Sequence, residues 1–520
     1  MQILDLLVIV AYLVATAWLG LRLSGRQSGL KDYFLGGRNL PWWAVCLSVV
    51  ATETSALTVI GIPVMSYLGN ISYLQLGIGY IVGRIVVAFV MLPRYYDGEM
   101  VTAYAYLGKR FGSSTQTTAG VTFLFTRLLA DGIRVLAAAI PLKVILDGLG
   151  LHTNYFVITV VLAVVTIAYT FIGGIKAVVW VDVVQMLLYV AGGLLTIVVV
   201  TSTLGLGWLG DAAEAGKTQM FVLAGNPLSD DASLIPSLLG GAIFAMASHG
   251  SDQLVVQRLL TCRSKLEAQK ALIWSGVMVF VQFAIFLVVG LALWGYYDHA
   301  TPQEMGLTRD DEVFPLFIVE GLPTGISGLL LAGILAAAMS TLSSSLSALS
   351  SSTVTDVVGR LRRTPLTDQQ GLRVGRWATI GWGLAFIAPA TFFRSDEGNI
   401  VVLALGVAGI TYGGLLGAFV FGIVNKRADK RDANIAFVLA VAVNAFFFVM
   451  EKYVTGEVWV AWQWYPLLGV IVTCIVGGLL SLTHPPRPAP LEPAGHGPTG
   501  TPAAGGPPPA DAPTSEDRTR

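Results

Sequence analysis

The amino-acid sequence predicts an all-α polytopic membrane protein with about thirteen transmembrane helices. Of its 520 residues, 54% are hydrophobic and only 12% are charged, about half the charged share of a soluble globular protein. Apolar runs about 20 residues long recur from Ile3 to Leu482, and each can cross a hydrocarbon core of about 30 Å. This pattern excludes a soluble multidomain protein.

Each predicted span is an apolar run bounded by charged or turn-forming residues. The first run, LDLLVIVAYLVATAWLGLRL, has no basic stretch before it and no small-residue cleavage pattern after it. It is therefore interpreted as a retained helix and not as a signal peptide. The predicted spans are 3–22, 41–66, 72–93, 119–147, 153–172, 180–204, 233–250, 271–295, 325–355, 374–393, 399–424, 434–452 and 463–482.

The distribution of Lys and Arg predicts the orientation in the membrane. With the N-terminus outside, the inward loops and their borders carry 21 Lys and Arg residues, and the outward loops carry 4. The positive-inside rule thus favours an N-terminus outside and a C-terminus in the cytoplasm, for a multi-pass protein of the plasma (inner) membrane. The transmembrane domain is predicted over 1–482. Residues 483–520, rich in Pro, Ala and Gly, are predicted to form a disordered cytoplasmic tail.

Several ionisable residues lie inside the predicted spans, where such groups usually face the bundle interior or a water-filled path. Arg127, Asp131 and Arg134 are spaced i, i+4 and i+7, so they share one helix face. They form either an internal ion-pair ladder or a positive face toward Glu53 or a substrate carboxylate, and the sequence leaves both open. The full set is Glu53, Arg84, Arg127, Asp131, Arg134, Lys143 and Asp182.

Two spans, seven apart in the chain, are unusually rich in hydroxyl groups. Range 325–355 carries a serine stripe along one helix face, and range 41–66 contains ATETSALTVIGIP, which is typical of an interrupted helix. Close helix packing accounts for part of the stripe. Hydroxyls and freed backbone carbonyls are also the ligands that a hard cation prefers, and paired unusual spans fit an ion-coupled transporter built from repeats. The stripe is Ser340, Ser343, Ser344, Ser347 and Ser351.

Five motifs along the chain together resemble the sodium:solute symporter family, in its bacterial type. They are KDYFLGGRNLPWW, FIGGIKAVVWVDVVQ, SDQLVVQRLL, AAAMSTLSSSLSALSSSTVTD and TYGGLLGAFVFGI. The resemblance implies a five-plus-five inverted-repeat core of the leucine-transporter type, with repeats over about 41–204 and 233–424. It also implies sodium-coupled uptake of a small organic solute by alternating access.

The same resemblance implies where sodium would bind. The principal site would lie between the broken second span and the ninth span. Its ligands would be the carbonyl oxygens of Ala51, Thr54 and Ala337 and the side chains of Ser340 and Thr341.

A second sodium site is an open possibility, because some members of the family place an aspartate in the fifth core helix. Asp182 stands at that position, and Ser340, Ser343 and Ser344 would complete the site. The alternative is that Asp182 is a plain helix-end carboxylate without a bound ion.

The solute is expected to be an amino acid or a small carboxylate rather than a sugar. Sugar-carrying members use a carboxylate in the third span, and this chain has none there. Glu53 falls where proline-carrying members have an aspartate, and its partner stays open: Arg134, a substrate amine or a proton. The candidate substrate or gating residues are Glu53, Ser55, Arg134 and Ser248.

Two other functions stay open: a proton-coupled symporter in which Glu53 and Asp182 titrate, and a transporter-like membrane sensor of a solute. An enzyme is not expected, because the sequence has no paired-acid metal motif and no His/Cys cluster near a membrane face. The expected ion is Na⁺, with no cofactor. The expected partners are the solute, Na⁺ and the lipid bilayer, with no nucleic acid and no obligate protein partner.

Overall fold

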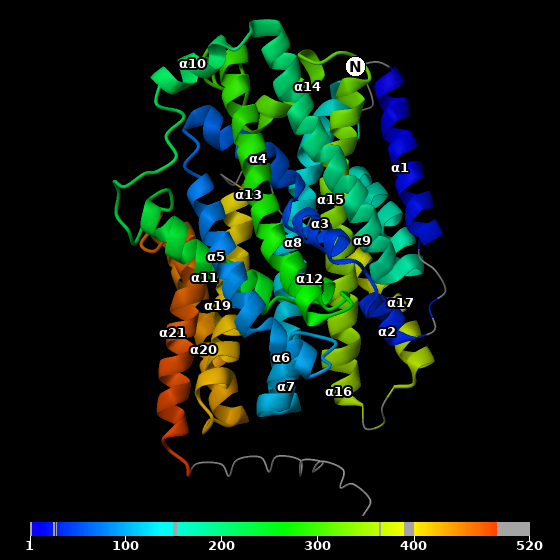
Figure 1. The fold of residues 1–520 in the computed structure, drawn as a ribbon, viewed down its shortest axis with the longest axis vertical. Helices are drawn as coiled ribbons and strands as arrows, with labels where there is room; N and C mark the ends of the chain where they lie inside the picture. Colours follow the sequence, from blue (N-terminus) through cyan, green and yellow to red (C-terminus); the bar gives the residue numbers. More distant parts are fainter. Residues whose placement is uncertain are drawn as a thin grey trace, which may run out of the picture.

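A computed structural model describes residues 3–23, 27, 29–148, 153–362, 364, 366–388 and 400–485. The described residues are mostly helical and contain no β-strand, and most of the long helices run side by side (Figure 1). The helices are α1 (Ile3–Leu23), α2 (Leu30–Leu35), α3 (Trp42–Glu53), α4 (Ala56–Leu68), α5 (Leu74–Val90), α6 (Leu92–Asp97), α7 (Ala105–Phe111), α8 (Ser113–Gly148), α9 (Tyr155–Leu204), α10 (Gly207–Glu214), α11 (Gly241–Gly250), α12 (Gln253–Leu259), α13 (Lys265–Tyr296), α14 (Val313–Glu320), α15 (Ile326–Ser352), α16 (Gly359–Leu361), α17 (Asp368–Ala385), α19 (Ile400–Val424), α20 (Lys430–Val449) and α21 (Tyr465–Ser481).

Each of the thirteen predicted spans coincides with helix in the described part of the chain. By length and composition, eight described helices are able to cross a membrane, or nine when the bent pair α3 and α4 is counted as one span. The number of spans therefore remains approximate, while the helical membrane architecture agrees with the sequence. The tail predicted over 483–520 lies almost wholly outside the described residues.

Helix α9 joins two predicted spans, 153–172 and 180–204, into one 50-residue element. A straight helix of this length would measure about 75 Å, more than twice the membrane core. Gly174 breaks it, with φ 56° and ψ −159°, a conformation that strongly favours glycine. A Cβ atom at this position would also meet the carbonyl oxygen of Tyr33 at 2.7 Å. The break divides α9 into two segments, each long enough for one crossing.

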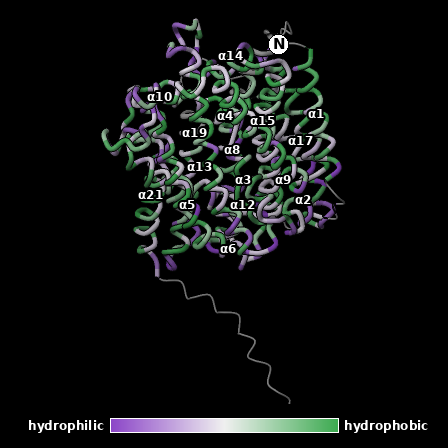
Figure 2. Tube along the Cα trace, turned by 45° about the horizontal axis from the view of Figure 1, so that its top comes forward, coloured by the Kyte–Doolittle hydropathy of each residue, from purple (hydrophilic) through white to green (hydrophobic). Residues whose placement is uncertain are grey.

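The helices differ sharply in how deeply they are buried, and this identifies the centre of the bundle. In the most apolar stretch of α15, 89% of the residues are buried, whereas the corresponding share for α1 is 22%. Figure 1 accordingly shows α15 within the bundle and α1 at its edge. Hydrophobic residues run along the bodies of the helices, and hydrophilic residues gather toward loops and helix ends (Figure 2). The serine-rich helix is thus a core element, and α1 offers its apolar surface to lipid.

Helices α4 and α13 touch closely at Gly290, and this contact gives a stability prediction. A Cβ atom at Gly290 would overlap the carbonyl oxygen of Pro63 and the hydroxyl of Ser66. Because the Pro63 carbonyl belongs to the backbone, the two helices must separate to admit a methyl group. We expect Gly290→Ala to destabilise the protein by about 1–3 kcal/mol, the usual effect of overpacking. The melting temperature of the purified protein measures this.

The matched control for this substitution is Gly381→Ala in α17. An added Cβ atom there meets no heavy atom within 4 Å. Since alanine favours helix over glycine by up to about 1 kcal/mol, this variant should be neutral or slightly stabilised. Equal melting temperatures for the two variants would contradict the close contact between α4 and α13.

Candidate functional site

The break between α3 and α4 is the first element of the site. The two helices are bent by 68° at this point. Thr54 (φ −80°, ψ 107°) and Ser55 (φ −98°, ψ 171°) have extended backbones, and Ser55 caps α4 through a reciprocal capping box with Thr58. Hydroxyl side chains compete with helical hydrogen bonds in this way, so ATETSAL ends one helix and starts another. The interruption predicted from the sequence is present.

The break removes the usual helical donors from two of the predicted sodium ligands. The amide of Ser55 donates to the Thr58 hydroxyl (3.3 Å) and therefore not to the carbonyl of Ala51. The amide of Thr58 donates to the carbonyl of Ser55 (2.9 Å) and therefore not to that of Thr54. Carbonyl oxygens released from helical bonds retain lone pairs for a cation.

Helix α15 supplies the remaining predicted ligands and lies against the end of α3. The hydroxyl oxygens of Thr52 and Ser344 are 3.0 Å apart and link the two helices. The Thr341 hydroxyl donates to the carbonyl of Ala337 (3.1 Å), while the Ser340 hydroxyl donates to Asp182 (2.7 Å). Because each hydroxyl uses its hydrogen as a donor, its oxygen lone pairs remain for a cation. The donor set is of the all-oxygen kind that suits Na⁺.

Asp182 lies at the centre of a buried polar cluster. Its carboxylate accepts hydrogen bonds from Ser48 (2.6 Å) and Ser340 (2.7 Å), and it pairs with Arg258 at 3.3 Å. The Ser343 hydroxyl instead donates to the carbonyl of Ser340 (3.1 Å). The predicted spans place Arg258 in an inward loop, yet its side chain is fully buried.

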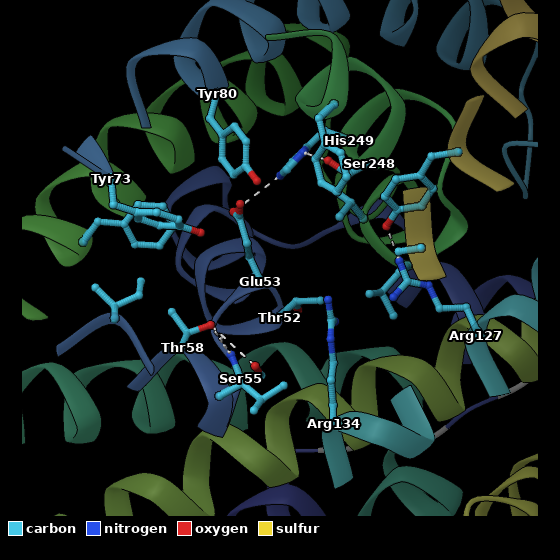
Figure 3. A pocket seen from close by; sticks show the side chains of 18 residues that line it. Thr52, Glu53, Ser55, Thr58, Tyr73, Tyr80, Arg127, Arg134, Ser248 and His249 are labelled. Atoms are coloured by element: carbon cyan, nitrogen blue, oxygen red, sulfur yellow. Dashed lines mark hydrogen bonds and ion pairs between the residues drawn. The ribbon is translucent and has the colours of Figure 1, made fainter. Parts of the chain in front are cut away.

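A cavity beside the helix break brings together all four predicted substrate or gating residues: Glu53, Ser55, Arg134 and Ser248 (Figure 3). It contains about 820 Å³ of space, including the part open to solvent. Aromatic rings also line it. These are Tyr73, Tyr80, Phe244, Phe283 and Tyr412.

Glu53 has a partner that the sequence analysis did not assign to it. Its carboxylate forms an ion pair with Arg84, whose side chain is wholly buried and also donates to the Ser275 hydroxyl (2.9 Å). The Nε2 atom of His249 lies 3.5 Å from the same carboxylate, and the His249 Nδ1 atom is 2.8 Å from the Ser248 hydroxyl. The position of Arg84 inside a predicted span indicates a buried functional or structural charge, but nothing in the sequence links Arg84 to Glu53.

Arg127, Asp131 and Arg134 form the ion-pair ladder that was one of the two alternatives. Asp131 pairs with Arg127 at 3.2 Å and with Arg134 at 3.4 Å. Arg127 also contacts Asp252 and the hydroxyl of Tyr412, so its guanidinium is engaged on several sides. The Arg134 side chain is 14% exposed and reaches into the cavity from the side opposite Tyr80 (Figure 3).

Among the described residues, one group of carboxylate and imidazole side chains lies close enough together to hold a metal ion: Asp429, Asp432 and His484. Its carboxylates are used locally. Asp429 accepts the amides of Arg431 (2.7 Å) and Asp432 (3.1 Å) at the start of α20, and Asp432 pairs with His484 at 2.8 Å, which raises the pKa of His484. The cluster therefore acts as a helix cap that anchors the end of α21.

Known proteins that resemble this chain in sequence are sodium-coupled transporters. The sequence model of the sodium:solute symporter family matches residues 33–439. The chain is 27% identical to the sodium/sialic acid symporter NanT of Aliivibrio fischeri, over 92% of each chain. It is 28% identical to human sodium-coupled monocarboxylate transporter 1, over 85% of this chain and 72% of that protein.

The fold matches a solved structure of a Na⁺-coupled sialic acid symporter in a substrate-bound outward-open state. The TM-score is 0.81 at 26% identity, covering 93% of this chain and 99% of the other. The predicted fold class, an all-α membrane protein with the transporter core of this group, is therefore confirmed.

Proposed function

The chain belongs to the sodium:solute symporter family, and we propose that it takes up an amino acid or a small carboxylate together with sodium. Its relatives are transporters, so the chain is a sodium-coupled solute symporter of the membrane and not an enzyme. The solute class goes beyond the family assignment. It rests on one observation: a partly exposed cation, Arg134, and a partly exposed anion, Glu53, line the same cavity.

The two charged groups favour a solute that carries a carboxylate. Arg127 is held by Asp131, Asp252 and Tyr412, whereas Arg134 is held by Asp131 alone among the described residues. Arg134 therefore retains donors for a carboxylate, and arginine binds carboxylates through paired hydrogen bonds. Glu53 can accept a hydrogen bond from a solute amine while Arg84 holds it in place. This arrangement suits an amino acid, and a monocarboxylate would use the Arg134 side alone.

Sodium is proposed to bind where the break of α3 and α4 meets α15. The ligands would be the carbonyls of Ala51, Thr54 and Ala337 and the hydroxyls of Ser340 and Thr341. Sodium entering from outside would order the break against α15 and complete the neighbouring solute cavity. One charge moving down 100 mV supplies about 2.3 kcal/mol, roughly a fifty-fold solute gradient.

The proposed orientation places the N-terminus outside and the C-terminus in the cytoplasm. It rests on the excess of Lys and Arg in the loops predicted to face inward. The start of α1 and the end of α21 lie at opposite ends of the bundle (Figure 1), as expected for an odd number of crossings.

The solute class is tested by thermal-shift measurements on the purified protein, with amino acids, monocarboxylates and sugars, in NaCl and in KCl. A ligand that binds the native state raises its melting temperature. An amino acid or carboxylate that stabilises the protein only in NaCl would support the proposal. Stabilisation by a sugar alone would overturn the solute class while leaving sodium coupling intact.

Substituting Arg134 should weaken solute binding specifically. A hydrogen bond to a charged group contributes about 1.5–3 kcal/mol, so Arg134→Gln should raise the KM for the solute about 10- to 150-fold. Arg134→Lys keeps the charge and should retain part of the affinity. Uptake into proteoliposomes measures the effect, with Arg373→Gln, an exposed residue of α17, as control. An unchanged KM in Arg134→Gln would show that the solute carboxylate binds elsewhere.

A further inference from the structure

Arg258 is a fully buried arginine of the short helix α12, and its guanidinium joins four helices. A buried guanidinium needs hydrogen-bond partners and a compensating charge. Its partners are the Ser48 hydroxyl (from Nε, 3.0 Å), the Leu254 carbonyl (from Nη1, 2.8 Å), the Asp182 carboxylate (from Nη2, 3.3 Å) and the Ser344 hydroxyl (from Nη2).

The guanidinium and a second sodium ion would need the same oxygen atoms. Asp182 and Ser344 both belong to the second sodium site predicted from the sequence, and both accept hydrogen bonds from Arg258. The other oxygen of Asp182 accepts the Ser340 hydroxyl (2.7 Å). Arginine N–H groups and a sodium ion both bind to oxygen lone pairs. A sodium ion in this cluster would therefore compete with Arg258 for the same oxygen atoms.

The charges of the cluster also disfavour a sodium ion beside Arg258. In the described part of the chain, Arg258 is the ion-pair partner of Asp182, and both side chains are wholly buried. One positive and one negative charge leave the cluster neutral. A sodium ion added beside Arg258 would leave a net positive charge in a buried place, which is unfavourable. The bond from Arg258 to Leu254 lies within α12 and does not depend on Asp182, so the guanidinium retains a partner when it withdraws.

We propose that Arg258 competes with a sodium ion for the Asp182 carboxylate, and thereby limits the number of sodium ions bound with each solute. The inference rests on the proposed sodium coupling and adds a residue that sets its stoichiometry. While Arg258 contacts Asp182, the tethered guanidinium supplies the positive charge there, and sodium would bind at the principal site alone. Filling the second site requires Arg258 to leave the carboxylate.

The test is equilibrium binding of radioactive sodium to the purified protein, with potassium or choline keeping the ionic strength constant. The wild-type protein should bind one sodium ion tightly and a second at least about tenfold more weakly. Arg258→Gln should bind the second ion at least about tenfold more tightly than the wild type. Arg258→Lys keeps a competing charge and should resemble the wild type, and Asp182→Asn added to Arg258→Gln should remove the gain.

Identical sodium binding by the wild type and a well-folded Arg258→Gln variant would overturn the competition. A gain that persists without the Asp182 carboxylate would also overturn it. If Arg258→Gln does not fold, the sodium-binding curve of the wild-type protein is sufficient. Two wild-type sodium sites of equal affinity would mean that Arg258 does not compete for one of them. Absence of sodium binding from all the proteins would instead overturn the proposed sodium coupling, so the two failures are distinguishable.

Discussion

Removing the hydroxyl groups of Ser340 and Thr341 together is expected to shift the sodium dependence of solute uptake to far higher sodium concentrations. Both side chains are buried on α15, and both are proposed ligands of the principal sodium site. Each interaction of a hydroxyl with a charged partner contributes about 1.5–3 kcal/mol. The loss of two ligands should therefore raise the sodium concentration for half-maximal uptake at least about 100-fold. Uptake into proteoliposomes across a series of NaCl concentrations measures this.

A matched control separates ion binding from helix packing. Ser350 is also buried on α15, where its hydroxyl donates to the carbonyl of Leu346 (2.6 Å) and lies 2.9 Å from the Thr379 hydroxyl. Ser350→Ala removes a hydroxyl of the same helix away from the proposed ligands and should keep the normal sodium dependence. If the Ser340→Ala/Thr341→Ala protein folds and retains the wild-type sodium dependence, the principal site lies elsewhere.

The parts of the site that are local in sequence were predictable. The helix break at Thr54 and Ser55 follows from hydroxyl side chains that compete with backbone hydrogen bonds, and the sequence shows them directly. The burial of α15 follows in the same way from its small and hydroxyl residues, which let other helices approach closely. Both features depend on residues within a few positions of one another, so periodicity and composition are sufficient to find them.

The charge pairs were not predictable, because they join helices far apart in the chain. Arg258 follows the seventh predicted span by a few residues and counted as a loop charge, yet α12 turns back into the bundle and buries it against Asp182. Glu53 and Arg84 are 31 residues apart on different helices. The sequence was equally consistent with an ion pair between Glu53 and Arg134. Which pair forms depends on helix packing, and hydrophobic periodicity does not specify that.

Breaking the pair between Glu53 and Arg84 is expected to have the largest effect on stability. Arg84→Gln would leave the Glu53 carboxylate without its arginine partner, with only 18% of its side chain exposed. Removing one partner of a buried pair costs about 3–5 kcal/mol, and contact with the cavity places this pair near the low end, about 3 kcal/mol. The melting temperature of the purified variant should therefore fall by several degrees, while Arg373→Gln, at an exposed position of α17, should leave it unchanged.

The double variant Glu53→Gln/Arg84→Gln separates charge from packing. Glutamine at both positions removes both charges, so no uncompensated charge remains, and the double variant should be more stable than Arg84→Gln. The hydrogen bond from Arg84 to Ser275 is lost in both proteins and cancels in this comparison. A double variant as unstable as Arg84→Gln would mean that Arg84 stabilises the bundle by filling space. Recovery of stability would identify Arg84 as the reason a carboxylate is tolerated at Glu53, inside a membrane-spanning helix.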